Sequence, residues 1–364
     1  MKHKNYTKVL FLTPHPIEGA SSRYRIIQFF PYLEERGIHC TLNSFFSSKA
    51  YTYLYKHRFL IRKFISFLVG AVKRLYYILR AGNFDAVYIH LEFFPIPLKI
   101  LETIVKSFNK HIIYDLDDSI YLHRESANKI REYFRGPEKL YRLLKISSEV
   151  TVCNKYLYTY ARQYNKNITI IPTSLDTQKF KPLPIRRTNN PIVIGWIGSH
   201  STAKYINIIS NVLKRLAQKY RFIFKVVGSG KPIEIEGVRV INRDWSLERD
   251  VEEFQTCDIG VYPLADDEWT KGKTGFKTIQ FMAVGVPCVV SRAGANIEIV
   301  EDGKNGFLAD TEAEWIEKLS KLIEDAELRM KIGRAGRETV EEKFSLNHIA
   351  SLFHQVIMRA AYGG

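Results

Sequence analysis

Short apolar runs alternate with longer amphipathic stretches along the whole chain. The runs are VLFLT from Val9, AVYIHL from Ala86, HIIYDL from His111, EVTVC from Glu149 and ITIIP from Ile168, followed by PIVIGWIG, FIFKVVG, VRVI, DIGVYPL and PCVVS. Helix-length segments lie between them, for example 22–35, 205–220, 277–284 and 312–323. Uninterrupted apolar runs are typical of parallel strands buried on both faces, which helical crossovers connect. The pattern predicts an α/β fold with two doubly wound parallel sheets.

The stretch KFKPLPIRRTNNP, residues 179–191, interrupts this periodicity. Each proline disfavours helix in the residue before it, so we interpret the stretch as a linker. A chain of 364 residues also exceeds the size at which single cores stop growing, about 250–300 residues. We expect two Rossmann-like domains, 1–185 and 190–345.

The charge is distributed unevenly between these two parts. Residues 1–190 hold 31 Lys and Arg against 14 Asp and Glu, whereas residues 191–364 hold 23 against 24. Such an asymmetry indicates that the first part faces a polyanion, either a nucleic acid or an anionic membrane.

Residues 37–84 contain no Asp or Glu, and residues 56–80 mix Phe, Leu, Ile, Val and Tyr with seven Lys and Arg. Their longest uncharged run, 64–72, is shorter than the roughly 20 apolar residues of a membrane span. Interleaved cations and apolar residues favour a helix lying on an anionic bilayer, which we place at 51–80. The alternative is a solvated basic face on an ordinary packed helix.

The four cysteines are far apart in the sequence and form no CxxC pair, so we interpret them as reduced core residues. The apolar run from Val9 is too short for a signal peptide and is better explained as a first strand. We therefore expect a cytoplasmic protein that is peripheral to the inner face of the cell membrane.

The segment IGWIGSHSTAK contains a buried strand, then Gly198, a polar turn and a helix start. A glycine after a strand lets backbone N–H groups approach an anion, and a helix N-terminus adds partial positive charge. Lys204 lies at the start of that helix, where it can reach a phosphate. Strand–glycine–helix turns also occur as plain connections, which is the alternative here.

A second segment, DDEWTKGKTGFKTIQF, places Lys271, Lys273 and Lys277 around a glycine-rich turn that precedes a helix. This arrangement suits a diphosphate. Gln280 lies three residues after Lys277 and hence on the same helix face, where it could bind a sugar or ribose hydroxyl. A solvated lysine loop is the alternative.

From end to end the chain resembles glycosyltransferase family 4, also called glycosyl transferases group 1, which has the GT-B fold. The C-terminal half carries the clearest similarity: GWIGSHSTAK, DWSLERDVEEFQTCDIGVYPL, GKTGFKTIQFMAVGVPCVVS, NIEIVEDGKNGFLADTEAEW and RAGRETVEEKFS. In the first half, GASSRYRIIQFFPYLEERGI, IIYDLDDSIYL and ITIIPTSLDTQKFKP are similar to the same group.

The resemblance implies two domains that face each other across a cleft, with a C-terminal helix at 346–364 that packs back on the first. It also implies a nucleotide-diphosphate sugar as donor, bound mainly by the C-terminal half. The donor-binding residues that it implies are Gly198, Ser199, Gly228, Ser229, Trp245, Lys273, Gly275, Phe276, Lys277 and Gln280. Gln280 falls where the family usually has the second Glu of a motif, and Gly272 falls at the first. The family often has Arg where this chain has Ser199, and we expect Lys273 and Lys277 to replace that charge.

For the acceptor we expect Gly19, Ser21 and Arg23 in the first βα loop, together with Asp117 and Asp118 of YDLDD. Polar groups just past the carboxyl ends of strands are where open α/β sheets place ligands. Lys204, Glu92 and His90 are the candidate catalytic residues. A Mg²⁺ site at DLDD is an alternative, but we expect no metal and no cofactor, because GT-B enzymes generally neutralise the leaving diphosphate with cations and helix dipoles.

These features predict a hexosyltransferase that retains anomeric configuration, with a glycan or lipid-linked acceptor of surface polysaccharide biosynthesis. A nucleic-acid-binding protein is the main alternative, but no zinc, helix-turn-helix or RNP-type pattern is present and we expect no nucleic-acid partner. An inactive GT-B scaffold that binds a membrane or nucleic acid is the other alternative, because of Gly272 and Ser199.

Overall fold

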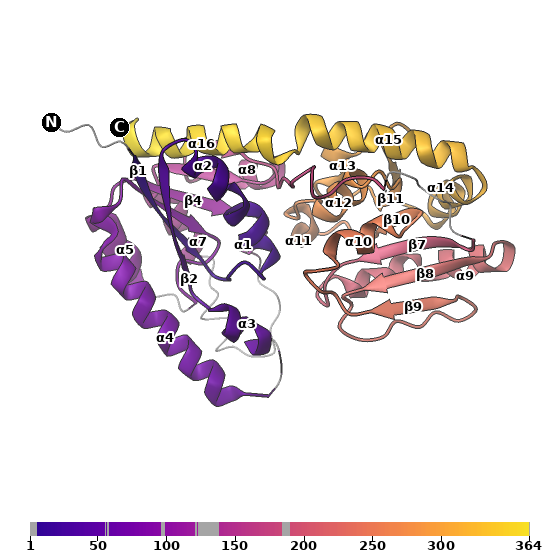
Figure 1. Cartoon of the computed structure of the whole chain (residues 1–364), viewed down its shortest axis with the longest axis horizontal. Coiled ribbons are helices and arrows are strands. Elements are labelled where there is room, and N and C mark those ends of the chain that lie inside the picture. Colours follow the sequence, from indigo (N-terminus) through magenta and orange to yellow (C-terminus); the bar gives the residue numbers. More distant parts are fainter. Residues whose placement is uncertain are drawn as a thin grey trace. The chain divides into compact units, whose positions relative to one another are not determined.

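The computed structural model describes residues 6–54, 56, 58–95, 99–120, 122, 138–183 and 190–363. The chain divides into two compact units, a first unit of Met1–Thr173 and Leu346–Gly364 and a second unit of Ser174–Ser345 (Figure 1). Each contains one sheet of six parallel strands with helices on its faces.

The sheet of the first unit has the order β2-β1-β3-β4-β5-β6. Its strands are β1 (Thr7–Thr13), β2 (Ile38–Ser44), β3 (Ala86–His90), β4 (Ile112–Leu116), β5 (Glu149–Val152) and β6 (Ile168–Ile170). The apolar pattern predicts all of these except β2. That strand lies at the edge of the sheet and is mostly half-buried, so its sequence IHCTLNS mixes polar and apolar residues.

The helical segments of the first unit are α1 (Ala20–Arg25), η1 (Ile27–Phe29), α2 (Phe30–Glu34), α3 (Ser48–Leu54), α4 (Leu60–Leu79), η2 (Ala81–Asn83), α5 (Lys99–Phe108), α7 (Glu138–Ile146), α8 (Lys155–Ala161) and α16 (Leu346–Tyr362). The single helix predicted at 22–35 is wrong. It breaks at Ile26, whose φ and ψ are −129° and −66°, and restarts at α2, which has Pro31 in its first turn, where proline is tolerated.

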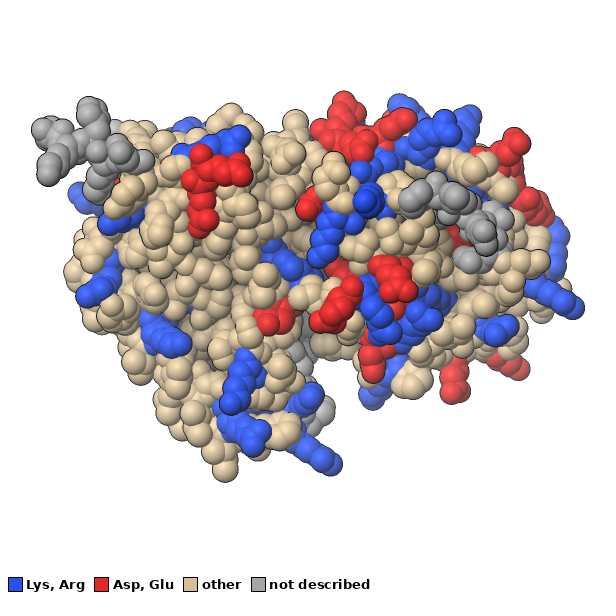
Figure 2. Space-filling model, in the orientation of Figure 1, with Lys and Arg blue, Asp and Glu red and all other residues tan. Residues whose placement is uncertain are grey.

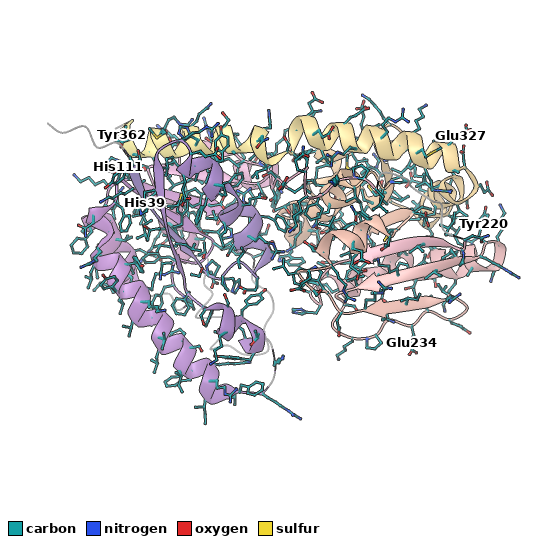
Figure 3. The ribbon with its side chains drawn as sticks, in the orientation of Figure 1. His39, His111, Tyr220, Glu234, Glu327 and Tyr362 are labelled. Atoms are coloured by element: carbon teal, nitrogen blue, oxygen red, sulfur yellow. The ribbon has the colours of Figure 1, made fainter. Side chains whose placement is uncertain are left out.

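The C-terminal helix α16 packs on the sheet of the first unit. Phe353 stacks on Phe29 with ring centroids 4.5 Å apart and lies 5.1 Å from the ring of Tyr88 on β3. At the far end of α16, the hydroxyl of Tyr362 lies 3.0 Å from that of Thr7 at the start of β1 (Figure 3). Residues more than 300 positions apart therefore share one core.

Helix α4 is fixed to the sheet by a buried cation and a glycine. Arg74 is fully buried and donates to the carbonyl oxygens of Thr13 at 2.7 Å, Asn43 at 3.0 Å and Phe93 at 2.6 Å. Burial lowers the pKa of Arg74 to about 9. At Gly70 a Cβ would lie 2.4 Å from the carbonyl oxygen of Phe45, so only glycine permits this close approach. Within the described ranges, no helix has the length and apolar character needed to cross a membrane.

The sheet of the second unit has the order β12-β11-β10-β7-β8-β9. Its strands are β7 (Ile192–Ile197), β8 (Phe222–Val227), β9 (Val240–Arg243), β10 (Ile259–Tyr262), β11 (Cys288–Ser291) and β12 (Phe307–Ala309). Only β12 lacks the apolar pattern, because its run of three apolar residues is bounded by Gly306 and Asp310.

The helical segments of the second unit are η3 (Ala203–Ile209), α9 (Ser210–Lys219), α10 (Asp250–Gln255), α11 (Glu268–Lys271), α12 (Phe276–Ala283), α13 (Asn296–Ile299), α14 (Glu312–Glu324) and α15 (Ala326–Lys343). The helix predicted at 205–220 begins earlier and is 3₁₀ over its first seven residues. Lys204 therefore lies in a 3₁₀ turn.

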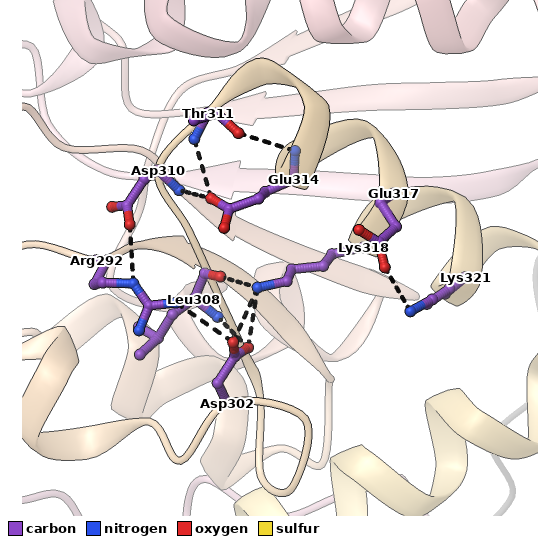
Figure 4. A network of polar contacts seen from close by, with 9 residues as sticks. All are labelled: Arg292, Asp302, Leu308, Asp310, Thr311, Glu314, Glu317, Lys318 and Lys321. Carbon is purple, nitrogen blue, oxygen red and sulfur yellow. Dashed lines mark hydrogen bonds and ion pairs between the residues drawn. The ribbon is translucent and has the colours of Figure 1, made fainter.

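A polar network fixes α14 against β12 (Figure 4). The side chains of Thr311 and Glu314 form a capping box at the start of α14. One turn later, Lys318 lies 3.0 Å from Asp302, which also accepts a bond from the backbone N–H of Leu308 at 2.9 Å. None of these residues belongs to the candidate sites described below, and we interpret the network as structural.

Both sheets contain a point where the strand order reverses. In the first unit β2 is added on one side of β1 and β3 on the other, and in the second unit β8 and β9 extend one side of β7 before β10 pairs with the other. Open α/β sheets bind ligands at this switch point, beyond the carboxyl ends of the strands. The candidate ligand sites are therefore the loops after β1 and β3, and those after β7 and β10.

Candidate functional site

In the first unit a chain of polar side chains crosses the switch point between β1 and β3. Ser21 follows β1, and its Oγ lies 2.7 Å from Nε2 of His90, the last residue of β3. The same Oγ donates to Oδ2 of Asp117 at 2.6 Å, just after β4. Nδ1 of His90 lies 2.7 Å from Oδ2 of Asp115, at the end of β4. We call Ser21, His90, Asp115 and Asp117 the first-unit network.

The hydrogen bonds of this network constrain its protons. Ser21 has one hydroxyl proton, and when it donates to Asp117 its oxygen can only accept from His90. The imidazole of His90 then donates from both nitrogens, from Nε2 to the hydroxyl of Ser21 and from Nδ1 to the carboxylate of Asp115. Such an arrangement can hold and pass a proton along a fixed path.

Asp115 is anchored by a buried ion pair. Arg25 contacts both of its carboxylate oxygens, and Thr151 donates to Oδ1 at 2.7 Å. Burial by itself would raise the pKa of Asp115, but Arg25 and His90 hold it well below its usual value. Asp115 therefore stays ionised and orients His90. Sequence reasoning singled out neither Arg25 nor Thr151, because nothing local distinguishes them from other helix and strand residues.

Asp117 retains one open bonding position. Its Oδ1 is buried and has no hydrogen-bond partner among the described side chains and backbone. Asp118 accepts a bond from the backbone N–H of Ser119 at 2.8 Å. Glu92 is half-buried and follows Leu91, which has a positive φ of 55°. Of the acidic candidates, Asp117 has the geometry to accept a bond from a hydroxyl.

The two other candidates in the loop after β1 shape the loop itself. The Nη1 of Arg23 donates to the carbonyl oxygens of Ile17 at 2.9 Å and Glu18 at 3.3 Å. At Gly19 a Cβ would lie 2.5 Å from that of His15, so the loop closes tightly there. These residues hold Ser21 in place.

In the second unit, the turns after β7 and β8 touch each other. Gly228 has a φ of 80°, and a Cβ there would lie 2.5 Å from the carbonyl oxygen of Gly198. A Cβ at Gly198 would lie 2.4 Å from the ring of Trp196. Both positions thus require glycine, and they form a surface without side chains at the carboxyl edge of the sheet.

The remaining candidates near these turns are held by local bonds. Trp245 lies beside Gly228, and its Nε1 donates to Asp250 at 2.9 Å. Ser229 donates to the carbonyl oxygen of Lys231 at 2.7 Å. The hydroxyl of Ser199 lies 2.9 Å from that of Ser201 and is exposed.

The two lysine-bearing motifs meet through an aromatic pair. Tyr205 of η3 stacks on Trp269 of α11 with ring centroids 6.5 Å apart. Nζ of Lys204 lies 4.9 Å from the Tyr205 ring centroid, and Nζ of Lys273 lies 3.5 Å from that of Trp269. Sequence reasoning did not identify this pair, which joins the loops after β7 and β10.

The start of α12 forms a second polar pair. Lys277 donates to Oε1 of Gln280 at 2.9 Å, while Nε2 of Gln280 is buried without a partner in the described part of the chain. Gly275 precedes Phe276, the first residue of α12; it has a φ of 65°, and a Cβ there would lie 2.4 Å from Ile299. In contrast, Lys271 pairs with Glu268 at 2.8 Å. The three lysines of this loop thus have different environments.

Comparisons with known proteins give consistent results. Residues 191–325 match the family model described as glycosyl transferases group 1. An uncharacterized glycosyltransferase of Methanocaldococcus jannaschii is 26% identical over 300 residues, 78% of this chain and 79% of that protein. The capsular polysaccharide biosynthesis glycosyltransferase CapM of Staphylococcus aureus is 28% identical over 187 residues, 47% of each chain.

Among solved structures, HepE of Anabaena in complex with UDP-glucose has a TM-score of 0.67 and 17% identity, over 97% of this chain and 99% of that one. A likeness at this identity concerns the fold. It confirms the expected α/β class with two Rossmann-like sheets of the GT-B type.

Proposed function

We propose that this chain is a glycosyltransferase of the group 1 family and that it transfers a sugar from a nucleoside-diphosphate sugar to a glycan or lipid-linked acceptor in surface polysaccharide biosynthesis. One observation carries the proposal. At the switch point of the second unit, two touching glycine turns lie beside loops that bear Lys204 and Lys273.

The second unit has the chemistry to bind the donor. Backbone without side chains at Gly198 and Gly228 lets a diphosphate approach, and Lys204 and Lys273 supply positive charge. We assign the base to Trp245, whose indole is fixed by Asp250. The HepE structure contains UDP-glucose, which has a base and a diphosphate of this kind.

We assign the ribose to the pair of Lys277 and Gln280. The buried Nε2 of Gln280 is a donor without an acceptor, and such a group has a free-energy cost of about 1–3 kcal/mol unless a ligand satisfies it. A ribose hydroxyl would be a suitable acceptor. Phe276 and Gly275 position this pair at the start of α12.

Transfer of the sugar from a nucleoside-diphosphate donor requires electrostatic stabilisation of the leaving nucleoside diphosphate. A fixed cation near developing negative charge is commonly worth about 3–4 kcal/mol in the transition state. We propose that Lys204 and Lys273 supply this without a metal, and that the configuration at the sugar is retained. In the first unit, the open Oδ1 of Asp117 would bind and deprotonate the acceptor hydroxyl, and His90 would hold Asp117 in position through Ser21.

We also propose that the chain acts on the inner face of an anionic membrane through α4. The exposed large apolar residues of this helix recur at helical spacing along its whole length: Leu60, Ile61, Phe64, Ile65, Leu68, Val69, Val72, Leu75, Tyr76 and Leu79. An outward apolar face of this length indicates a binding surface.

Charge complementarity favours a membrane as the partner of α4. Arg58, Arg62, Lys63 and Lys73 accompany the apolar face, and residues 37–84 contain no acidic side chain. Lys and Arg gather over the part of the first unit where α3 and α4 lie (Figure 2). Anionic headgroups attract such a helix by roughly 1 kcal/mol per cation, and its apolar side chains enter the interface.

The activity is tested by incubating the purified chain with UDP-, GDP- and ADP-sugars, with and without a total lipid extract. Release of nucleoside diphosphate, with appearance of a glycosylated lipid or glycan, is expected for one donor class. An arm with EDTA tests metal independence, and the anomeric coupling constant of the product tests retention. If no donor binds and none is cleaved, the proposed function is wrong.

A further inference from the structure

A cavity of about 660 Å³ opens between α3 and α4, beyond the carboxyl end of β2. We call it the α3–α4 pocket. The hydroxyl of Tyr53 on α3 lies 2.7 Å from that of Ser66 on α4, and both residues line the pocket. Gly70 lines it as well, where α4 approaches Phe45. None of its lining residues belongs to the donor or acceptor candidates described above.

The polar lining of the pocket is cationic. Lys49 comes from α3, and Arg62 and Lys73 come from α4. The lining includes four serines and no carboxylate, and within the described ranges none of the three cations forms an ion pair. Three cations and several hydroxyls on two facing helices suit a phosphate group.

The apolar lining continues out of the pocket. Ile65 and Val69 line it, yet they are 53% and 50% exposed and belong to the outward apolar face of α4. A ligand that fills the pocket therefore meets cations at one end and an apolar helix face at the other. This combination fits an amphiphile with a phosphate head and a hydrocarbon chain.

The pocket also borders the loop that leads to the first-unit network. Pro16 lines the pocket, and its carbonyl oxygen accepts a bond from the N–H of Gly19 at 2.9 Å. Ser21 follows two residues later and contacts His90. A head group in the pocket thus lies against the same short loop that holds the proposed acceptor side chains.

We propose that the α3–α4 pocket binds the phosphate of a lipid-like acceptor, whose hydrocarbon chain lies along Ile65 and Val69. The inference rests on the proposed function, because it identifies the acceptor class as a lipid phosphate. Lys49, Arg62 and Lys73 bind the phosphate, and the loop from Pro16 to Ser21 directs the group beyond it toward Asp117.

The test uses dodecyl phosphate, below its aggregation concentration, in calorimetric titrations of the full chain. Inorganic phosphate represents the head alone, and dodecyl maltoside represents the chain with an uncharged head. The proposal predicts that dodecyl phosphate binds with one-to-one stoichiometry and about tenfold or more tightly than either. Equal affinity for dodecyl maltoside would show mere detergent adsorption on α4 and would overturn the proposal.

Two double variants, each of which removes two positive charges, distinguish binding in the pocket from general electrostatic attraction. Lys49→Ser with Lys73→Ser removes two lining cations, and Arg58→Ser with Lys63→Ser removes two cations of the same segment that do not line the pocket. The first pair is expected to weaken dodecyl phosphate binding about tenfold and the second less than about twofold. Equal effects of the two pairs, or none in either, would overturn the proposal. Circular dichroism checks the fold of both.

A failure of the pocket inference can be distinguished from a failure of the proposed function. All four tryptophans, at positions 196, 245, 269 and 315, lie in the second unit, so quenching of their fluorescence reports the donor site. If quenching by a sugar nucleotide persists while dodecyl phosphate does not bind, the pocket inference alone is wrong. If no sugar nucleotide quenches or reacts, the proposed function is wrong.

Discussion

Tyr205 and Trp269 stack with an interplanar angle of 28°, and each ring faces a lysine of its own motif, Lys204 or Lys273. The stack brings the loop after β7 and the loop after β10 together at the point where the strand order of the second unit reverses. A cation over an aromatic face is attracted by about 0.5–1 kcal/mol at an exposed site. The attraction is weak enough for either lysine to turn toward a phosphate.

The close contact between Gly198 and Gly228 predicts that a Cβ at position 228 destabilises the fold. Gly237, which has a similar positive φ, is the control for backbone strain alone. Gly228→Ala introduces a Cβ 2.5 Å from a carbonyl oxygen at a φ of 80°, whereas Gly237→Ala has a φ of 74° and no atom within 4 Å. We expect Gly237→Ala to lower the free energy of unfolding by about 1 kcal/mol and Gly228→Ala by about 2–4 kcal/mol. Urea unfolding measures both.

Donor binding should follow the same order. Gly228→Ala is expected to abolish the quenching of tryptophan fluorescence by a sugar nucleotide. Gly237→Ala is expected to leave the midpoint of that titration unchanged. Similar stability and binding in the two variants would show that the glycine contact is unimportant.

Much of the fold could be predicted from the sequence. The runs of apolar residues identify ten of the twelve strands because strands buried on both faces need such runs. The edge strand β2 and the short strand β12 lack this signal. The break at Ile26 has no local signal either, since helical periodicity continues through Phe29 and Leu33, which are both buried.

The candidate sites were only partly predictable, because tertiary contacts complete them. Glycine turns and lysine clusters are local signals, and so they could be identified at Gly198 and Lys273. The stack of Tyr205 on Trp269 joins segments far apart in sequence, as does the pair of Arg25 and Asp115. Neither has a local pattern that would distinguish it from ordinary packing.

Arg25 and Asp115 form a buried pair whose disruption should be costly. Arg25→Met leaves the carboxylate of Asp115 buried without its paired cation. We therefore expect the free energy of unfolding to fall by about 3–5 kcal/mol. Arg36→Met is the control, because Arg36 pairs with Glu35 at 3.7 Å on the surface, where the expected loss is below about 0.5 kcal/mol. Urea unfolding of both variants checks this, and a loss under about 1 kcal/mol for Arg25→Met would contradict it.

His15 should make the first unit less stable in mild acid. Burial, with a smaller contribution from the charge of His90, lowers the pKa of His15 to about 4. The unfolded chain binds this proton near pH 6.5, so between pH 6.5 and 4 the unfolded state holds more protons and stability falls as the pH falls. The loss approaches about 3 kcal/mol at the acid end.

The variant His15→Gln removes this titration. Its free energy of unfolding is therefore expected to change less between pH 7 and pH 4.5 than that of the wild type. Parallel pH profiles for the two proteins would show that His15 does not contribute. Asp115 keeps its charge throughout this range, because its pKa is held well below the usual value.

The apolar face of α4 should decide membrane binding. In flotation with vesicles containing phosphatidylglycerol we expect the wild-type chain to float, and to float less at high salt. Ile61→Glu with Phe64→Glu should reduce binding about tenfold or more. Ile297→Glu with Met330→Glu, which changes two apolar residues of the second unit that are 55% and 54% exposed, should have little effect. Equal flotation of the two variants would refute a role for α4.

The central claim is that Lys204 and Lys273 bind the diphosphate of the donor. Its most direct test is a tryptophan-fluorescence titration with UDP and GDP, in which midpoints are compared. The account predicts saturable quenching, a midpoint raised about tenfold to a hundredfold by Lys204→Ala with Lys273→Ala, and a shift below about twofold for Lys271→Ala, since Lys271 pairs with Glu268. An unchanged midpoint in the double variant would contradict the account.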